Sequence, residues 1–172
     1  LDRNCFVTFS SASGSSIPPT DTVHLYGTTF HDSLLVNFAA YLSRLDNPDS
    51  KRIKAQSLAF FIYNLECRDA LLAATPRAPY RTENWLPDLQ VLSLRSQAGT
   101  AKGLFFAAQG GHNAESHNHN DVGNFVLYMD GKPALIDVGV GTYTRQTFSP
   151  DRYKLWFMQS QWHNCPTING VQ

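Results

Sequence analysis

The sequence predicts an α+β protein in which a helical segment is followed by an antiparallel β portion. Two observations support this class. Apolar residues recur at helical spacing between residues 30 and 65, and short apolar runs separated by Gly and Asn replace that pattern after Asn84. The chain can build a core, because 42% of its 172 residues are hydrophobic and 12% are aromatic. We therefore place a domain boundary near residue 82, giving a helical segment 1–82 and a β portion 83–172.

The helical segment is expected to start as a loop, because its first thirty residues are rich in Ser, Thr and Pro. Two amphipathic helices are predicted next, on either side of a break at Asn47-Pro48-Asp49. Their apolar side chains return every three or four residues: Phe30, Leu34, Leu35, Phe38, Leu42 and Leu45, then Ile53, Leu58, Phe61, Ile62 and Leu65. A third, short helical run is predicted over residues 68–74, ending at Thr75-Pro76.

The β portion is predicted to contain four short strands, at residues 91–94, 104–107, 125–128 and 134–136. Asp130-Gly131 is typical of a two-residue hairpin turn, because both residues tolerate positive φ angles. With this turn, opposing residue numbers sum to about 261, so Asn124 faces Asp137 and Val126 faces Leu135.

Charge and cysteine content exclude several classes of function. Lys and Arg number 14 and Asp and Glu also number 14, so the chain lacks the basic excess that nucleic-acid binding requires. No apolar run approaches the ~20 residues of a membrane span. The three cysteines, Cys5, Cys67 and Cys165, fit neither a disulfide framework nor a thiolate zinc site, and we expect buried small side chains. The chain begins without a targeting pattern, and we expect it to be an internal piece of a longer protein.

Histidines cluster in the β portion. Three of the six lie within residues 112–119, where chance would place about 0.3. In an extended segment residues i and i+2 face the same side, so His117 and His119 would point together toward a metal or a substrate. A polar surface loop rich in Asn and His is the alternative.

A buried acid and a third histidine extend this cluster toward a metal site. Asp137 lies in an otherwise apolar strand, where a carboxylate is costly unless it is paired or bound to a metal. The hairpin brings it near His119, and His163 could approach from the next segment. Two imidazoles, one carboxylate and a water suit tetrahedral zinc. Alternatively, Asp137 is an ordinary hydrogen-bonded acid and His163 caps a strand end.

These residues occur in an ordered set of motifs. Gly110-Gly111-His112-Asn113-Ala114-Glu115-Ser116-His117-Asn118-His119-Asn120-Asp121-Val122-Gly123-Asn124-Phe125 is followed by Asp137-Val138-Gly139, Arg152-Tyr153 and His163-Asn164. In this order, the set resembles the heparinase II/III-like polysaccharide lyases, including the oligoalginate lyases. The resemblance covers residues 84–172, about half of the chain.

The resemblance implies that residues 1–82 end an α/α toroid and that residues 83–172 begin a β-sandwich. It implies β-elimination in acidic, uronate-containing polysaccharides by a periplasmic or secreted enzyme. His117 and Tyr153 would be catalytic, Asn118 and Arg152 would bind substrate, and His119, Asp137 and His163 would hold zinc. Which catalytic residue is the base, which glycan is cleaved and whether the enzyme is a homo-oligomer stay open. The toroid supplies further catalytic residues in this family, so we expect the isolated piece to be inactive.

Two other functions are considered. Gly111 followed by His117-Asn118-His119 fits the opening of a cupin metal motif, in which His117 would itself be a ligand, but the expected glutamate falls on Gly123 or Asn124. A non-catalytic carbohydrate-binding sandwich would use exposed aromatic residues such as Trp156, Phe157 and Trp162.

Overall fold

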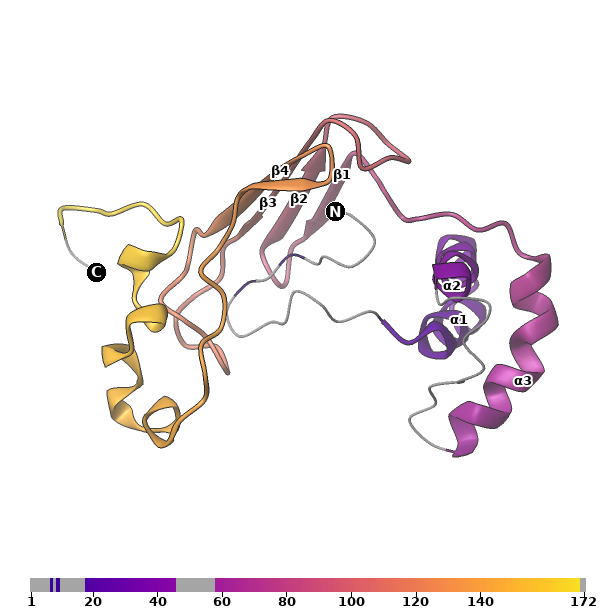
Figure 1. Cartoon of the computed structure of the whole chain (residues 1–172), viewed down its shortest axis with the longest axis horizontal. Helices are drawn as coiled ribbons and strands as arrows, with labels where there is room; N and C mark the ends of the chain where they lie inside the picture. The colour runs from indigo at the N-terminus through magenta and orange to yellow at the C-terminus, as the bar shows by residue number, and fades with distance from the viewer. Residues whose placement is uncertain (1–6, 8, 10–17, 46–57, 171–172) are drawn as a thin grey trace. The chain divides into compact units, whose positions relative to one another are not determined.

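The computed structural model describes residues 7, 9, 18–45 and 58–170. It divides into a helical unit, Ile17–Tyr80, and a sheet unit that comprises Leu1–Ser16 and Arg81–Gln172. The three helices and five antiparallel strands of the described residues confirm the predicted α+β class. Figure 1 shows the helices α1–α3 and the strands of the sheet.

The helical unit begins with α1, Thr20–Thr29, where a loop was predicted. Its buried face consists of Asp21, His24 and Gly27, so it carries no apolar periodicity that sequence reasoning could detect. Gly27 allows close packing on the next helix, because a Cβ atom there would lie 2.8 Å from the backbone nitrogen of Val36. The loop prediction was wrong, because α1 packs through a close backbone approach at Gly27 and buries the polar residues Asp21 and His24. Neither feature leaves an apolar pattern in the sequence.

The other two helices are α2, Ser33–Leu45, and α3, Leu58–Ala73. Asp32 caps α2, since its Oδ1 accepts from the backbone N–H of Leu34 at 2.8 Å. The short helix predicted over residues 68–74 is instead the C-terminal part of α3. Cys67 and Leu71 of this helix pack against Ala39 of α2. The break at Asn47-Pro48-Asp49 and residue Ile53 lie outside the described residues.

The sheet has the sequential order β1-β2-β3-β4-β5 with antiparallel pairing throughout. Its strands are β1 (Glu83–Leu86), β2 (Val91–Arg95), β3 (Leu104–Gln109), β4 (Phe125–Met129) and β5 (Lys132–Leu135). The edge strand β1 was not predicted, because its sequence Glu-Asn-Trp-Leu has little β-branched character.

The β4–β5 hairpin has the predicted turn. Asp130 and Gly131 have φ angles of 52° and 76°, and Met129 opposes Lys132. A bulge beyond Tyr128 then shifts the register, so Leu127 opposes Leu135 and the predicted pairing of Val126 with Leu135 is wrong.

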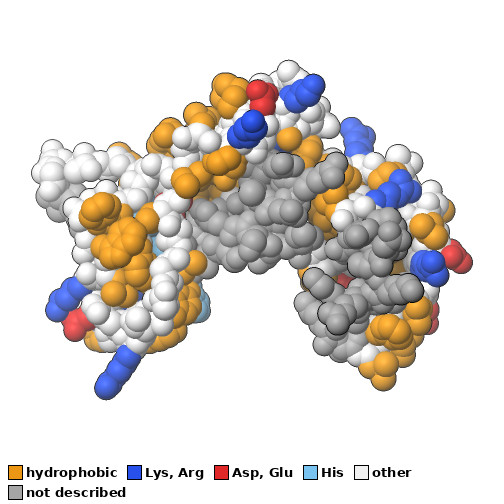
Figure 2. All heavy atoms as spheres, in the orientation of Figure 1, with side chains coloured by type: hydrophobic (Ala, Val, Ile, Leu, Met, Phe, Trp, Pro, Cys, Tyr) orange, Lys and Arg blue, Asp and Glu red, His pale blue; other side chains and the backbone are white. Residues whose placement is uncertain are grey.

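One face of the sheet carries a core of Phe105, Ala107, Val126 and Tyr128, against which Val7 and Phe9 pack. On the visible surface, Figure 2 shows further hydrophobic side chains, and exposed ones on the strands include Leu94, Leu104, Met129 and Leu135. No helix among the described residues is long and apolar enough to cross a membrane.

After β5 the chain forms four short 3-10 helices: Arg145–Phe148, Pro150–Lys154, Trp156–Met158 and Ser160–Trp162. Phe157 and Met158 are buried within this segment. It leads directly into His163 and therefore positions the C-terminal part of the predicted site.

Candidate functional site

The loop 110–124 between β3 and β4 carries the histidine cluster. Its ends are closed by the Gly123 N–H, which donates to the Gln109 carbonyl at 2.8 Å. Its middle is tied to the 3-10 segment by the Asn120 N–H, which donates to the Met158 carbonyl at 3.0 Å. Both ends of the loop and its centre are thus fixed by backbone hydrogen bonds.

His117 and His119 do not share one environment, contrary to the prediction from an extended segment. His117 has a φ angle of 60°, which turns the chain out of the extended conformation. Its side chain is exposed, whereas His119 is fully buried. The loop therefore places the His117 imidazole at the surface and the His119 imidazole in the interior.

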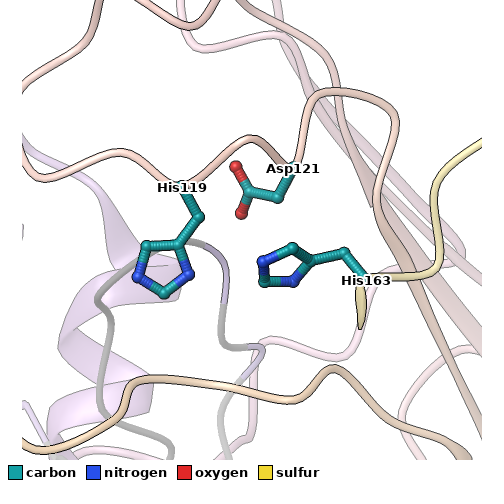
Figure 3. Close-up of side chains that lie close together, drawn as sticks. All are labelled: His119, Asp121 and His163. Atoms are coloured by element: carbon teal, nitrogen blue, oxygen red, sulfur yellow. The ribbon is translucent and has the colours of Figure 1, made fainter. Parts of the chain in front are cut away.

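The interior imidazole belongs to a buried cluster. His119, Asp121 and His163 each offer a ligand atom, and these atoms lie within 4.8 Å of one another. Figure 3 shows ring nitrogens of the two histidines facing each other with the Asp121 carboxylate beside the gap. The ring centroids of His119 and His163 are 5.3 Å apart. Sequence reasoning did not select Asp121 as a ligand, although its position two residues after His119 was an available signal.

Asp137 joins this cluster through His163. Its Oδ1 accepts from His163 Nδ1 at 2.6 Å and from Asn124 Nδ2 at 2.8 Å. Its Oδ2 accepts from the Gly139 N–H at 2.8 Å. The predicted approach of Asn124, Asp137 and His163 is therefore present, with Asp121 as a second buried acid close by.

The surroundings of the two buried histidines, His119 and His163, shift their pKa values in opposite directions. Burial, together with the neighbouring His163, lowers the pKa of His119 to about 4, so its imidazole is neutral at pH 7. Burial also opposes a charge on His163, but the hydrogen bond and charge of Asp137 outweigh it and raise the pKa of His163. For Asp137, burial is outweighed by hydrogen bonds from His163 and Gly139, which lower its pKa.

The donor set fits a divalent cation. His163 Nε2 lies 3.1 Å from the Phe157 carbonyl oxygen, so both of its ring nitrogens face acceptors, and a bound cation would replace one proton there. Two imidazoles and two carboxylates would balance a charge of +2 in a buried site. Cys165 is not part of this cluster, and burial raises the pKa of its thiol to about 11.

Tyr153, Arg152 and Asn118 form a second cluster beside this one. The Tyr153 hydroxyl donates to Asn118 Oδ1 at 2.8 Å, and Arg152 Nη2 donates to the Asn118 carbonyl at 2.7 Å. The Arg152 guanidinium lies 5.3 Å from the centre of the Tyr153 ring. The structure thus brings Arg152 and Tyr153 of the 3-10 helix Pro150–Lys154 into contact with Asn118, which follows His117 in the loop.

The aromatic residues near the site differ in exposure. Trp156 and Trp162 are each 53% exposed and meet edge to face with ring centroids 5.6 Å apart. Phe157 is buried, and its ring packs on His119 at 6.0 Å between centroids. Of the three aromatic residues considered for sugar binding, only the two tryptophans are accessible.

Comparison with known proteins places the chain in a family. The family model for the heparinase II/III-like C-terminal domain matches residues 86–172. Among solved structures, the crystal structure of heparinase III is similar in fold, with a TM-score of 0.59 and 20% sequence identity. The match covers 95% of this chain and 22% of that one, so the chain spans about a fifth of the length of heparinase III. The comparison with curated proteins finds no significant match. Because the family model covers half of its residues, the chain belongs to the heparinase II/III-like family.

Proposed function

We propose that this chain forms part of a polysaccharide lyase that cleaves uronate-containing acidic glycans by β-elimination. The observation that carries this proposal is the separation of two neighbouring histidines by one loop. His119 lies inside with His163 and two acids, while His117 is exposed near the Asn118–Tyr153 pair. An exposed imidazole and a phenol can serve proton transfer at a sugar while the buried imidazole serves a cation.

The roles follow from the chemistry of elimination. The proton at C5 of a uronate is weakly acidic, so the enzyme must neutralise the sugar carboxylate and supply a base. We assign His117 and Tyr153 to proton transfer. Arg152 supplies positive charge beside Tyr153. Arg152 and Asn118 are our candidates for binding the substrate, as the family resemblance implies.

The cation that we propose is zinc, held by His119, Asp137 and His163 with Asp121 as an additional carboxylate. Four protein ligands close a tetrahedral site, which is typical of structural zinc. When bound, the ion supplies positive charge that holds the loop, the hairpin and the 3-10 segment together. The support for this proposal is that His119, Asp121 and His163 are buried with their ligand atoms close together, and that Asp137 is hydrogen-bonded to His163.

The lyase function is tested with uronate oligosaccharides by the ultraviolet absorbance of the unsaturated product. The assay uses the longest natural polypeptide that contains residues 1–172. His117→Ala and Tyr153→Phe should each lower kcat by about 10²–10⁴-fold, whereas the exposed Tyr143→Phe serves as control. Product formation that is insensitive to both variants would exclude the proposed roles.

Metal analysis separates this function from the cupin alternative. Among the described residues, the group of side chains that could hold a metal ion contains His119 but not His117. His117→Ala should therefore retain bound zinc. Loss of the metal from His117→Ala, with retention in Tyr153→Phe, would instead favour a cupin-like centre.

A non-catalytic carbohydrate-binding function is supported by one observation, the exposed edge-to-face pair Trp156 and Trp162. Their rings could stack on the apolar face of a sugar. Calorimetry with uronate oligosaccharides distinguishes the two functions: binding that needs the tryptophans, without any turnover, favours this alternative.

Acidic polysaccharides or oligosaccharides are the substrates we propose, and the family supports a periplasmic or secreted location. Fractionation of the producing cells, followed by immunodetection of the protein, tests the location.

A further inference from the structure

Gln90 ends the turn between β1 and β2 and faces the start of the loop between β3 and β4. Val91 pairs with Gln109 in the antiparallel register of β2 and β3, so the next position on each strand sets Gln90 opposite Gly110. The Gly110 N–H donates to the Gln90 backbone carbonyl at 2.7 Å. The Gly111 N–H donates to the side-chain Oε1 of Gln90 at 3.0 Å. Two successive N–H groups of the loop are therefore accepted by one residue of a neighbouring turn.

Two glycines allow the loop to approach Gln90 this closely. A Cβ atom on Gly110 would lie 2.7 Å from Gln90 Oε1. Gly111 has a φ angle of 88°, in the left-handed region that favours glycine. A side chain at Gly110 would therefore push the Gln90 amide away from the loop. This contact gives the Gly110-Gly111 pair a structural reason that neither the cation site nor the proposed proton transfer supplies.

The backbone of Gln90 has a conformation that residues with a side chain rarely adopt. Its φ angle is 49°, where glycine would fit with less strain. The bond from its N–H to the Pro87 carbonyl, at 3.3 Å, is available to any residue except proline. The contribution that needs glutamine is the side-chain oxygen, because the Gly111 N–H can only donate and must face an acceptor.

Local hydrogen bonds connect this contact with the exposed His117. His112 Nδ1 accepts from the Ala114 N–H at 3.2 Å, which folds the first half of the loop on itself. The Asn113 carbonyl accepts from Nδ2 of the buried Asn118 at 2.6 Å, and Asn118 directly follows His117. The place at which the loop leaves the sheet therefore influences where His117 and Asn118 lie.

From these contacts we infer that Gln90 is a positioning residue, whose side-chain oxygen holds the start of the loop and thereby sets the position of His117 and Asn118. Gln90 acts through the loop backbone, so its loss should loosen the loop and leave the sheet in place. The holding of the loop does not depend on the proposed lyase function, whereas its effect on catalysis rests on that function.

Hydrogen exchange in the 172-residue chain, followed by NMR, tests the contact without turnover. Gln90→Met keeps the length of the side chain without its oxygen, and Gln90→Gly removes the side chain together with the strain at positive φ. In both, the Gly111 N–H and the Asn118 side-chain amide should exchange about 3–10-fold faster, as expected for the loss of one hydrogen bond. Gln90→Glu keeps an oxygen acceptor and should exchange slowly. Gln97→Met, in the exposed loop between β2 and β3, is the matched control.

Gln90→Gly separates positioning from a role in the turn alone. If only the turn matters, glycine fits there and the loop should exchange as in the unaltered chain, which would overturn the inference. Faster exchange at Gly111 without faster exchange at Asn118 would also overturn it, because the contact would then not reach His117 and Asn118. We expect the urea midpoint of the tryptophan fluorescence to stay unchanged. A lower midpoint with faster exchange throughout the sheet would reduce the effect to stability and contradict positioning.

The effect on catalysis is measured in the longest natural polypeptide that contains residues 1–172. With a uronate oligosaccharide, Gln90→Met should lower kcat about 10–100-fold at little changed KM, because proton transfer depends on the position of His117. Gln90→Glu should recover most of this loss. Equal kcat in Gln90→Met and the unaltered enzyme would overturn the catalytic effect. If the unaltered enzyme releases no unsaturated product, the lyase function fails, while hydrogen exchange still decides whether Gln90 holds the loop.

Discussion

At the scale of single residues, charge determines what the buried cluster can bind. Asp121 and Asp137 are 1% and 7% exposed, and the three hydrogen bonds to Asp137 keep it ionised. Two buried carboxylates without a compensating cation would be costly. A positive charge therefore stabilises the cluster: Asp137 raises the pKa of His163, which favours its protonated form, and a divalent ion would supply the same kind of charge.

This charge balance predicts the effect of removing either acid. Asp137→Asn and Asp121→Asn should each weaken zinc binding by about 10–100-fold or more, because the loss of a carboxylate that only orients a ligand already has that effect. Competition with a chromophoric chelator measures it. The exposed Asp151→Asn is the control, since the Asp151 carboxylate pairs with Lys154 at the surface. If Asp121→Asn binds zinc like the unaltered chain, the cation has three protein ligands and Asp121 is not one of them.

The candidate site could be predicted in part from the residues themselves. An acid in an apolar strand indicated Asp137, and the histidine cluster indicated His119, because both are unusual where they stand. The contacts of Asn118 with Arg152 and Tyr153 could not be predicted. They depend on the left-handed backbone of His117 and on the 3-10 segment that brings Tyr153 close, and neither leaves a periodic pattern.

At the scale of elements, the same reasoning explains which helices and strands were predicted. α2 and the start of α3 were predicted because their apolar residues repeat at helical spacing. α1 was missed because its buried face is polar, and β1 was missed because an edge strand needs only one partner and little apolar character. Patterns of hydrophobicity identify elements whose fully buried side chains are apolar. The fully buried residues of α1 are Asp21, His24 and Gly27, and β1 has none.

The polar face of α1 has a consequence for stability at low pH. His24 is buried, its Nδ1 lies 2.8 Å from the Tyr63 hydroxyl of α3, and burial lowers the pKa of His24 below 6.5. Below pH 6.5 the unfolded chain therefore binds a proton that the folded helix excludes. The free energy of unfolding of the helical unit should fall as the pH drops below this value and level off above it.

His24→Gln tests this prediction, because Gln does not titrate in this range. It should remove most of the pH dependence at a cost of about 1 kcal/mol from the altered hydrogen bond. Urea unfolding followed by the helical circular dichroism signal measures both effects. The exposed His31→Gln is the matched control and should leave the slope in place. An unchanged slope in His24→Gln would show that another group causes the acid sensitivity.

At the scale of the whole molecule, the division into two compact units separates the probes of unfolding. All three tryptophans, Trp85, Trp156 and Trp162, lie in the sheet unit, whereas α1, α2 and α3 form the helical unit. The candidate cation ligands also lie in the sheet unit. Tryptophan fluorescence and helical circular dichroism therefore report on different units of the same chain.

Zinc should therefore stabilise the sheet unit, which fluorescence reports, and leave the stability of the helical unit unchanged. A ligand that binds only the folded state at a free concentration a thousandfold above its Kd contributes about 4 kcal/mol. The fluorescence transition in urea should move to higher concentration with zinc and return with a chelator, while the circular dichroism transition stays in place. His119→Ala should abolish the shift. If zinc moves both transitions equally, the two units unfold as one cooperative structure, and the cation site stabilises the entire chain.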